Sequence, residues 1–252
     1  MSNPLSSFLF VLTFFTRFPL PHALGSRIEH DQGLNKAIIF FPMVGLIIGI
    51  LAGTVYFASS LLLPALVSAG LAVATGLIVT GALHEDGLAD CADGLGATSN
   101  REKALEIMRD SRIGAYGAVA LILSIGLRWT AISALSPLSG FLALLIAHSA
   151  SRSTIPLAMR FSQYARIDGL GGMAQGDIIE KEFYATLLIS AVIALLLGWN
   201  FGVIASAVGF LSAWLMLKYL EYRLGGYTGD GLGAMQQVAE ITILITLAGF
   251  WS

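Results

Sequence analysis

The feature that most constrains this sequence is a set of long stretches without any Asp, Glu, Lys or Arg. They cover residues 37–84, 113–127, 129–151, 183–217 and 241–252. A helix needs about 20 mostly apolar residues to cross the hydrocarbon of a bilayer. Charged residues make up only 12% of the chain, against about a quarter of a soluble domain, and the mean hydropathy is +0.79. The sequence therefore predicts an integral membrane protein in contact with the lipid bilayer.

Turn residues divide the apolar stretches into about seven expected membrane spans. These are residues 37–58, 64–83, 115–135, 138–158, 184–198, 201–218 and 236–252. The apolar stretch from Leu5 to Phe15 is too short to span and predicts an interfacial or re-entrant helix. No linker or change of composition divides the chain. We therefore expect an all-α, polytopic membrane helix bundle that forms a single domain over residues 1–252.

Charge is distributed unequally between the expected loops. The connections 59–63, 136–137 and 199–200 carry none. The opposite loops hold the basic residues Arg17, Arg27, Lys36, Arg101, Lys103, Arg109, Arg112, Arg160, Arg166, Lys181 and Arg223 and the acids Asp86, Asp90, Asp93, Asp110, Asp168, Asp177 and Asp230. Basic loops stay on the cytoplasmic side. We expect a cytoplasmic (inner) membrane protein whose chemistry occurs on the cytoplasmic face.

Two further features limit the partners. The net charge of −2 provides no basic field for nucleic acid. A single cysteine, Cys91, excludes an internal disulfide and a Cys-rich metal site. Gly45, Gly49 and Gly53 are four residues apart and predict close helix packing, either within the chain, which we favour, or in a homo-oligomer.

Three aspartates follow an apolar stretch in "HEDGLADCADG", residues 84–94. Asp86, Asp90 and Asp93 have the spacing i, i+4, i+7, which places them within about 60° on one face of a helix. Three such charges repel one another unless a cation lies among them, and hard oxygen ligands suit Mg²⁺ or Mn²⁺. A solvated helix end explains one acid better than three. The pattern therefore favours a metal site.

Two neighbours of these aspartates, Glu85 and His84, each have two expected roles. Glu85 falls off the shared face, so we expect it to face solvent or to support the metal ligands from behind. His84 is expected to be either a general base or a hydrogen-bonding group at the membrane boundary.

A basic segment, "REKALEIMRDSRIGAYG" (101–117), is predicted to form an amphipathic helix that ends at Gly114. Arg109 and Arg112 would share a face and suit phosphate oxygens, although basic residues here also set the topology. Asp110 would be either a further metal ligand or the partner of an arginine.

A glycine-rich turn, "GGYTGDGLGA" (225–234), precedes the last expected helix. Such a backbone before a helix N-terminus is a natural phosphate cradle, with Thr228 and Gly229 as its expected contacts.

Three charges lie within or at the edge of expected spans and should face the bundle interior or a wet cavity. We favour a phosphate or substrate role for Arg152, whose neighbour one turn earlier, His148, would line the same cavity. Arg128 and Glu240 would form a buried pair or snorkel to the interface.

Carboxylates for a divalent ion, arginines and a glycine-rich turn on one face together predict phosphoryl-type transfer from a nucleotide diphosphate. Several segments resemble the adenosylcobinamide-GDP ribazoletransferase (cobalamin synthase) family over essentially the whole chain. They are "FFTRFPLP" (14–21), "FFPMVGLIIG" (40–49), "HEDGLADCADG" (84–94), "EIMRDSRIGAYG" (106–117) and "TGDGLGA" (228–234).

The resemblance implies a Mg²⁺-dependent membrane enzyme. It would join α-ribazole, or its 5′-phosphate, to adenosylcobinamide-GDP and release GMP. Asp86, Asp90 and Asp93 would bind the metal, with Asp230 as a further ligand. Arg109, Arg112 and Arg152 would contact phosphates. His84 or one of the aspartates would be the base.

Two other classes share some of these features. A CDP-alcohol phosphotransferase also uses aspartates on membrane helices, but Ala89 and Asp90 stand where that family has Ala-Arg, and its later run of spaced aspartates is missing. A membrane transporter would place charges near the midplane, whereas these acids crowd one surface.

Overall fold

The computed structural model describes residues 3–19, 34–165 and 179–252. Within these ranges the regular elements are helices, and the β pairing is a single isolated bridge between Tyr164 and Tyr227. The expected all-α fold is therefore confirmed. The helices are α1 (Pro4–Phe15), α3 (Phe41–Ser60), α4 (Ala65–Thr80), α5 (Leu83–Ala97), α6 (Arg101–Ile107), α7 (Ala115–Ser133), α8 (Pro137–Arg152), α9 (Ile155–Phe161), α10 (Glu180–Leu224) and α11 (Gly229–Trp251), with short 3₁₀ turns η2 (Leu34–Lys36) and η3 (Ile38–Phe40).

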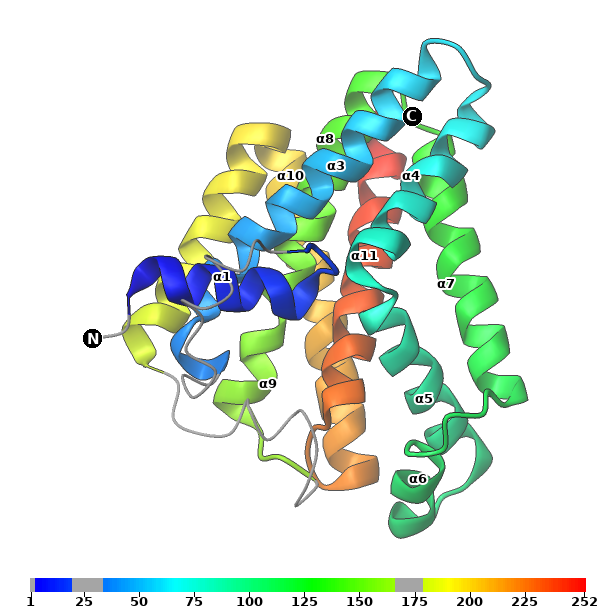
Figure 1. Cartoon of the computed structure of the whole chain (residues 1–252), viewed down its shortest axis with the longest axis vertical. Helices are drawn as coiled ribbons and strands as arrows, with labels where there is room; N and C mark the ends of the chain where they lie inside the picture. The colour runs from blue at the N-terminus through cyan, green and yellow to red at the C-terminus, as the bar shows by residue number, and fades with distance from the viewer. Residues whose placement is uncertain (1–2, 20–33, 166–178) are drawn as a thin grey trace.

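Five of the described helices are long and apolar enough to cross a membrane, or six if the bent pair α4 and α5 counts as one span. The expected number of seven is not confirmed. The short apolar helix predicted near the N-terminus is present as α1, which runs across the bundle in Figure 1.

A sharp bend ends the expected span 64–83 early. α4 stops at Thr80, and the chain turns by 90° into α5. Gly81 has φ 64° and Ala82 has φ 55°, so two successive residues adopt the left-handed region. Glycine reaches this region without a steric cost, but alanine does not. The bend points α5 along the polar end of the bundle.

The helix α10 contains the boundary between two of the expected spans. Its 45 residues would extend about 68 Å if straight, more than twice the thickness of the hydrocarbon. Trp199 interrupts it with the non-helical angles φ 49° and ψ −143°. A Cβ on Gly202 would meet the carbonyl oxygen of Ala194, so the chain reverses direction at Trp199 and the two halves of α10 are in contact next to this break. The yellow and the orange segments of Figure 1 are these two halves.

The three expected glycines on α3 form a packing seam with α8. A Cβ on Gly49 would lie 2.7 Å from the carbonyl oxygen of Leu144, and one on Gly45 would meet the backbone of His148. The intramolecular seam is thus confirmed. Because α8 of the same chain covers this face, the seam offers no free surface to a second copy.

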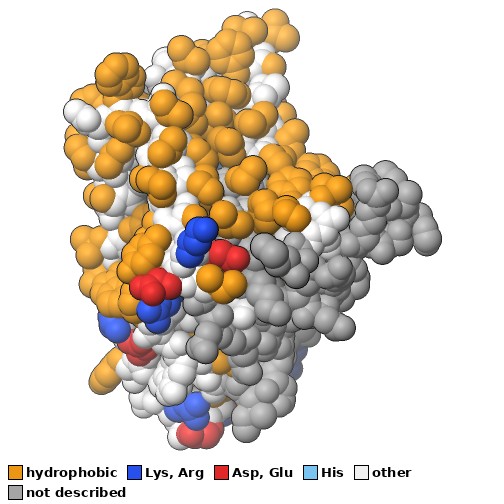
Figure 2. All heavy atoms as spheres, turned by 90° about the vertical axis from the view of Figure 1, so that its left-hand side faces the viewer, with side chains coloured by type: hydrophobic (Ala, Val, Ile, Leu, Met, Phe, Trp, Pro, Cys, Tyr) orange, Lys and Arg blue, Asp and Glu red, His pale blue; other side chains and the backbone are white. Residues whose placement is uncertain are grey.

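Charged side chains gather at one end of the molecule. Figure 2 shows hydrophobic side chains over the upper part of one face and Lys, Arg, Asp and Glu in the lower part. The uncharged α3–α4 and α7–α8 connections lie at the opposite end from α6 (Figure 1). On this face the charge of the described residues lies at one end, as expected, while the assignment of this end to the cytoplasm stays a prediction. Four residues used for it, Arg27, Arg166, Asp168 and Asp177, lie outside the described residues.

Candidate active site

The three aspartates of the acidic motif lie on one helix, α5, as predicted. Their environments differ along that face. Asp86 is exposed, Asp90 is half-buried, and Asp93 is 8% exposed. This face of α5 therefore runs from the surface into the protein, so the three aspartates cannot all have the same role.

A close crossing of α5 and α11 brings the two acidic motifs together. A Cβ on Gly87 would lie 2.7 Å from the backbone oxygen of Asp230, and one on Gly233 would lie 3.1 Å from the oxygen of His84. A side chain at Gly87 would clash with α11, and one at Gly233 would be in tight contact with the backbone of α5. The missing side chains therefore allow Asp86 and Asp230 to approach each other.

The N-terminus of α11 is built by Thr228. Its side chain is fully buried and accepts a hydrogen bond from the backbone N–H of Gly231 at 3.0 Å. This cap satisfies one of the free N–H groups at the start of the helix and leaves others. The helix N-terminus thus provides the partial positive charge expected of a phosphate cradle, with Thr228 shaping it.

A cavity of about 140 Å³ opens at this crossing. Asp86 and Asp230 line it, together with His84 and the backbone at Gly229. The rest of its lining is mostly apolar and includes Phe14 and Phe15 from the end of α1. The structure therefore unites two predicted ligands, one candidate base and part of the predicted phosphate cradle in one place.

Asp93 has a structural partner away from this cavity. Its Oδ2 accepts from the N–H of Gly114 at 2.7 Å, and its Oδ1 accepts from the N–H of Gly117 at 2.8 Å. A carboxylate is favourable at a helix N-terminus, so Asp93 fastens the start of α7 to α5. Among the described residues no group of three or more His, Cys, Asp or Glu side chains is placed so that it could hold a metal ion.

The prediction that one amphipathic helix continues from Arg101 to Gly114 is wrong. α6 ends at Ile107, and Gly114 is instead the residue that precedes α7. Asp110 supplies the reason, because its Oδ1 accepts from the backbone N–H of Arg112 at 3.1 Å and so stabilises a turn in place of a helix. Arg109 and Arg112 lie in this exposed connection.

Asp110 is the partner of an arginine in this structure. Arg112 Nη2 lies 2.6 Å from Asp110 Oδ2, and this hydrogen bond lowers the pKa of Asp110 to about 2. Asp110 does not line the cavity at Asp86 and Asp230. Of its two predicted roles, the arginine partner is the one present.

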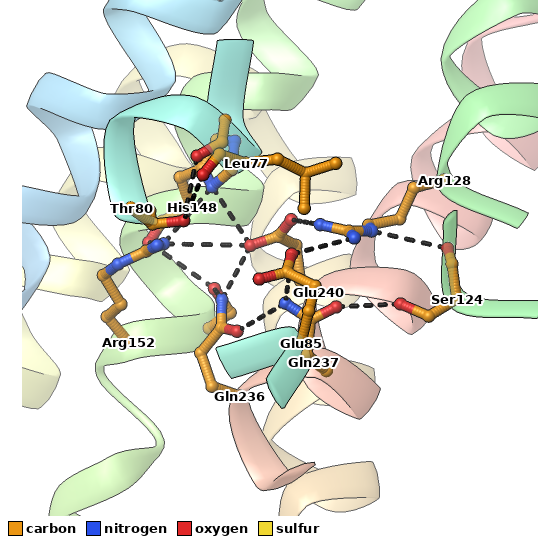
Figure 3. A network of polar contacts seen from close by, with 12 residues as sticks. Leu77, Thr80, Glu85, Ser124, Arg128, His148, Arg152, Gln236, Gln237 and Glu240 are labelled. Atoms are coloured by element: carbon orange, nitrogen blue, oxygen red, sulfur yellow. Dashed lines mark hydrogen bonds and ion pairs between the residues drawn. The ribbon is translucent and has the colours of Figure 1, made fainter. Parts of the chain in front are cut away.

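Figure 3 shows a buried network of polar side chains contributed by α5, α7, α8 and α11. Arg128 on α7 contacts Glu240 on α11 at 3.0 Å and Glu85 on α5 at 2.9 Å. The buried pair of Arg128 and Glu240 is therefore confirmed. The expectation that Glu85 faces solvent is wrong, since Glu85 is 5% exposed and its charge is matched by Arg128.

Two glutamines and two serines complete this network. Gln236 donates to Glu240 at 2.7 Å and to Ser151 at 2.8 Å, while Gln237 donates to Glu85 at 3.1 Å and accepts from Ser124 at 2.8 Å. Our sequence reasoning missed the glutamines. Their signal was present, because polar residues in an otherwise apolar spanning helix face the protein interior.

Arg152 and His148 meet in the same network. Arg152 is 1% exposed and donates to the carbonyl oxygen of His148 at 3.0 Å, and His148 Nδ1 lies 3.0 Å from Glu240. The guanidinium of Arg152 also lies 5.9 Å from the ring centroid of Phe15, which lines the cavity. Arg152 itself does not line the cavity, and its link to the cavity is this contact with Phe15.

These features define a multi-pass α-helical membrane protein with an acid-lined cavity at its polar end. The family model described as cobalamin-5-phosphate synthase matches residues 7–248. The chain belongs to this family, and it is a transferase of cobalamin synthesis.

Curated relatives carry one shared name, adenosylcobinamide-GDP ribazoletransferase. The relative from Bradyrhizobium diazoefficiens is 40% identical over 98% of this chain and 95% of its own length. The relative from Shewanella amazonensis is 36% identical over 98% and 96%, and that from Mesorhizobium japonicum is 42% identical over 93% and 89%. No solved structure matches the chain.

Proposed function

We propose that this chain joins α-ribazole, or α-ribazole 5′-phosphate, to adenosylcobinamide-GDP and releases GMP. The shared name of its relatives supports the substrates. In the proposed reaction a ribose hydroxyl oxygen attacks the phosphorus that bears cobinamide. The bond from this phosphorus to the bridging oxygen of the diphosphate breaks, GMP leaves with that oxygen, and the hydroxyl proton passes to a base.

The observation that carries this proposal is the convergence of Asp86 and Asp230 on one cavity. The two residues come from motifs that are more than a hundred residues apart in the chain, and close glycine packing holds their helices together. A pair of carboxylates beside a helix N-terminus suits a diphosphate only if a cation accompanies the substrate, because bare carboxylates repel phosphate. The site therefore calls for a divalent ion.

Mg²⁺, or Mn²⁺ in its place, fits this donor set. Mg²⁺ in phosphoryl-transfer sites is held by one or two carboxylates, with substrate phosphates and water as its other ligands. Asp86 and Asp230 would hold it, with Asp90 one turn along α5 as the next carboxylate. Asp93, the remaining predicted ligand, would act mainly by anchoring α7. When bound, the ion would neutralise the diphosphate and the charge that develops on departing GMP.

The chain's own groups would orient the substrates. N–H groups at the start of α11, shaped by Thr228 and Gly229, would donate to a phosphate. Arg109 and Arg112, on the connection between α6 and α7, would contact phosphates of the substrate. A carboxylate of the acidic cluster would take the hydroxyl proton, because the alternative base, His84, is 3% exposed and its ring packs 5.5 Å from that of Phe15.

The site would face the cytoplasm. The charge-bearing end of the bundle contains the cavity's acids, and basic loops are retained on the cytoplasmic side. A GDP-linked substrate and the GMP product would then exchange with the cytoplasm without crossing the membrane.

Substrate-dependent GMP release from the purified full-length protein tests the proposal. We expect release only when adenosylcobinamide-GDP, α-ribazole and Mg²⁺ are all present, and loss of release on addition of a chelator. Release of CMP from a CDP-alcohol, or uptake of substrate into vesicles without GMP release, would instead support a different class of protein.

A further inference from the structure

The acid-lined cavity has an apolar body that the phosphate chemistry does not use. Asp86 and Asp230 account for only part of its lining. The apolar part includes Phe14, Phe15, Leu34, Phe41, Ile155 and Leu232. Metal ions and phosphates gain nothing from such a surface, whereas an aromatic or aliphatic group does. The cavity is therefore suited to an apolar group of a ligand in addition to a phosphate and a metal ion.

His84 supplies a specific polar group within this apolar body. It lines the cavity and is 3% exposed, and its Nε2 is buried without a hydrogen-bond partner. Buried polar atoms normally have a hydrogen-bond partner, because an atom without one has lost its hydrogen bonds to water and gained none in the protein. A ligand in the cavity that carries a hydrogen-bonding atom would supply the missing partner.

The size of the cavity limits the ligand to a small ring system. An engineered apolar cavity of about 150 Å³ in another protein binds benzene, and this cavity measures about 140 Å³. Phe15 stacks near His84, with 5.5 Å between ring centroids and 30° between ring planes, and it packs edge-on against Phe41 at 4.9 Å. Such surfaces favour a planar aromatic ligand with one edge at the opening.

We propose that this cavity binds the aromatic heterocycle of the nucleoside acceptor, the benzimidazole ring of α-ribazole. The ring packs against Phe15 and Phe41, and His84 Nε2 forms a hydrogen bond to its free ring nitrogen. The attached ribose then lies at the opening beside Asp86 and Asp230, where its hydroxyl meets the phosphate. This inference rests on the proposed function and names its acceptor subsite.

The test is steady-state GMP release by the full-length protein in lipid nanodiscs, with the KM for each substrate measured separately. His84→Phe keeps the ring but removes the nitrogen, and His84→Gln restores a donor near the position of Nε2. We expect His84→Phe to raise the KM for α-ribazole about tenfold, the effect of one lost hydrogen bond. The KM for adenosylcobinamide-GDP should change less than about twofold, and His84→Gln should recover most of the loss.

A second pair of variants tests the apolar body without touching His84. Ile155→Phe fills the cavity and should raise the KM for α-ribazole selectively. Its matched control is Ile125→Phe, because Ile125 packs against a different core cluster and does not line the cavity. Equal effects of His84→Phe or Ile155→Phe on the two substrates, or no effect on either KM, would overturn the subsite.

Direct binding separates this proposal from the reaction itself. Calorimetric titration of the wild-type protein with benzimidazole should show binding that Ile155→Phe abolishes and Ile125→Phe retains. Binding of benzimidazole without any GMP release would preserve the subsite and refute the proposed reaction. GMP release with no benzimidazole binding, or benzimidazole that competes with adenosylcobinamide-GDP and not with α-ribazole, would refute the subsite alone.

Discussion

Arg128 and Glu240 form an ion pair of 3.0 Å between Nη1 and Oε1, with 4% and 2% of the two residues exposed. Glu85 approaches the same guanidinium at 2.9 Å. One cation thus joins α7 to both helices that carry the acidic motifs. This arrangement fixes α5 against α11, the two helices whose crossing carries the acids of the cavity.

Arg128→Met should strongly destabilise the fold. It leaves Glu85 and Glu240 buried without the cation that they share, a change that typically costs about 3–5 kcal/mol. Unfolding of purified protein in mixed detergent micelles measures it. Lys218→Met is the control, because its pair with Glu221 is exposed and should contribute at most about 1 kcal/mol. Equal unfolding free energies for the two variants would show that the network does not hold the helices together.

Asp93→Asn should affect stability, whereas Asp86→Asn should not. An amide offers one acceptor oxygen where Asp93 uses two, so the N–H of Gly114 or of Gly117 loses its partner at a cost of about 1–3 kcal/mol. Asp86 is exposed on the same helix. The same unfolding measurement compares them, and an Asp93→Asn variant as stable as Asp86→Asn would remove the anchoring role from Asp93.

Gly87→Ala should reduce activity by separating α5 from α11. The new methyl group would lie 2.7 Å from the backbone oxygen of Asp230, so one helix must move, and a displacement of about 1 Å can cost about a hundredfold in rate. Gly126→Ala on α7 is the control, since a Cβ there meets no atom within 4 Å. GMP release measures both variants. Full activity of Gly87→Ala would mean that the close crossing is unnecessary.

Asp230→Asn should increase the Mg²⁺ concentration needed for half-maximal GMP release by about tenfold or more, because a metal ligand is lost. Asp110→Asn provides the comparison. Asp110 binds Arg112 and does not line the cavity, so its removal should leave the Mg²⁺ requirement unchanged. A larger increase in this Mg²⁺ concentration for Asp110→Asn than for Asp230→Asn would indicate that Asp110, and not Asp230, is the metal ligand.

The helical class and most helix positions could be predicted because hydropathy and turn residues act locally. The expected break between residues 198 and 201 coincides with the kink at Trp199, and the glycine seam of α3 packs as expected. The bend at Ala82 could not be predicted, because nothing in an alanine signals a left-handed conformation. It is imposed by the packing around it.

The prediction of the site placed the three aspartates on the correct helix, but it did not include the residues that contact Asp93 and Glu85. The spacing of the three aspartates indicated a shared face of α5, and the structure confirms that helix. It could not show that Asp93 meets the start of α7 or that Glu85 meets Arg128, because both partners lie more than twenty residues away in the sequence. Contacts of this kind follow from tertiary packing and carry no local pattern.

The claim that Asp86 and Asp230 form one site is tested most directly by a double-mutant comparison. It measures GMP release by Asp86→Asn, Asp230→Asn and the variant with both changes. If both carboxylates serve one metal and diphosphate site, each single change should reduce the rate at least about a hundredfold. The double variant should then be scarcely slower than the worse single variant, because groups that act as a unit are not additive. A near wild-type rate in either single variant, or losses that multiply in the double variant, would contradict a shared site.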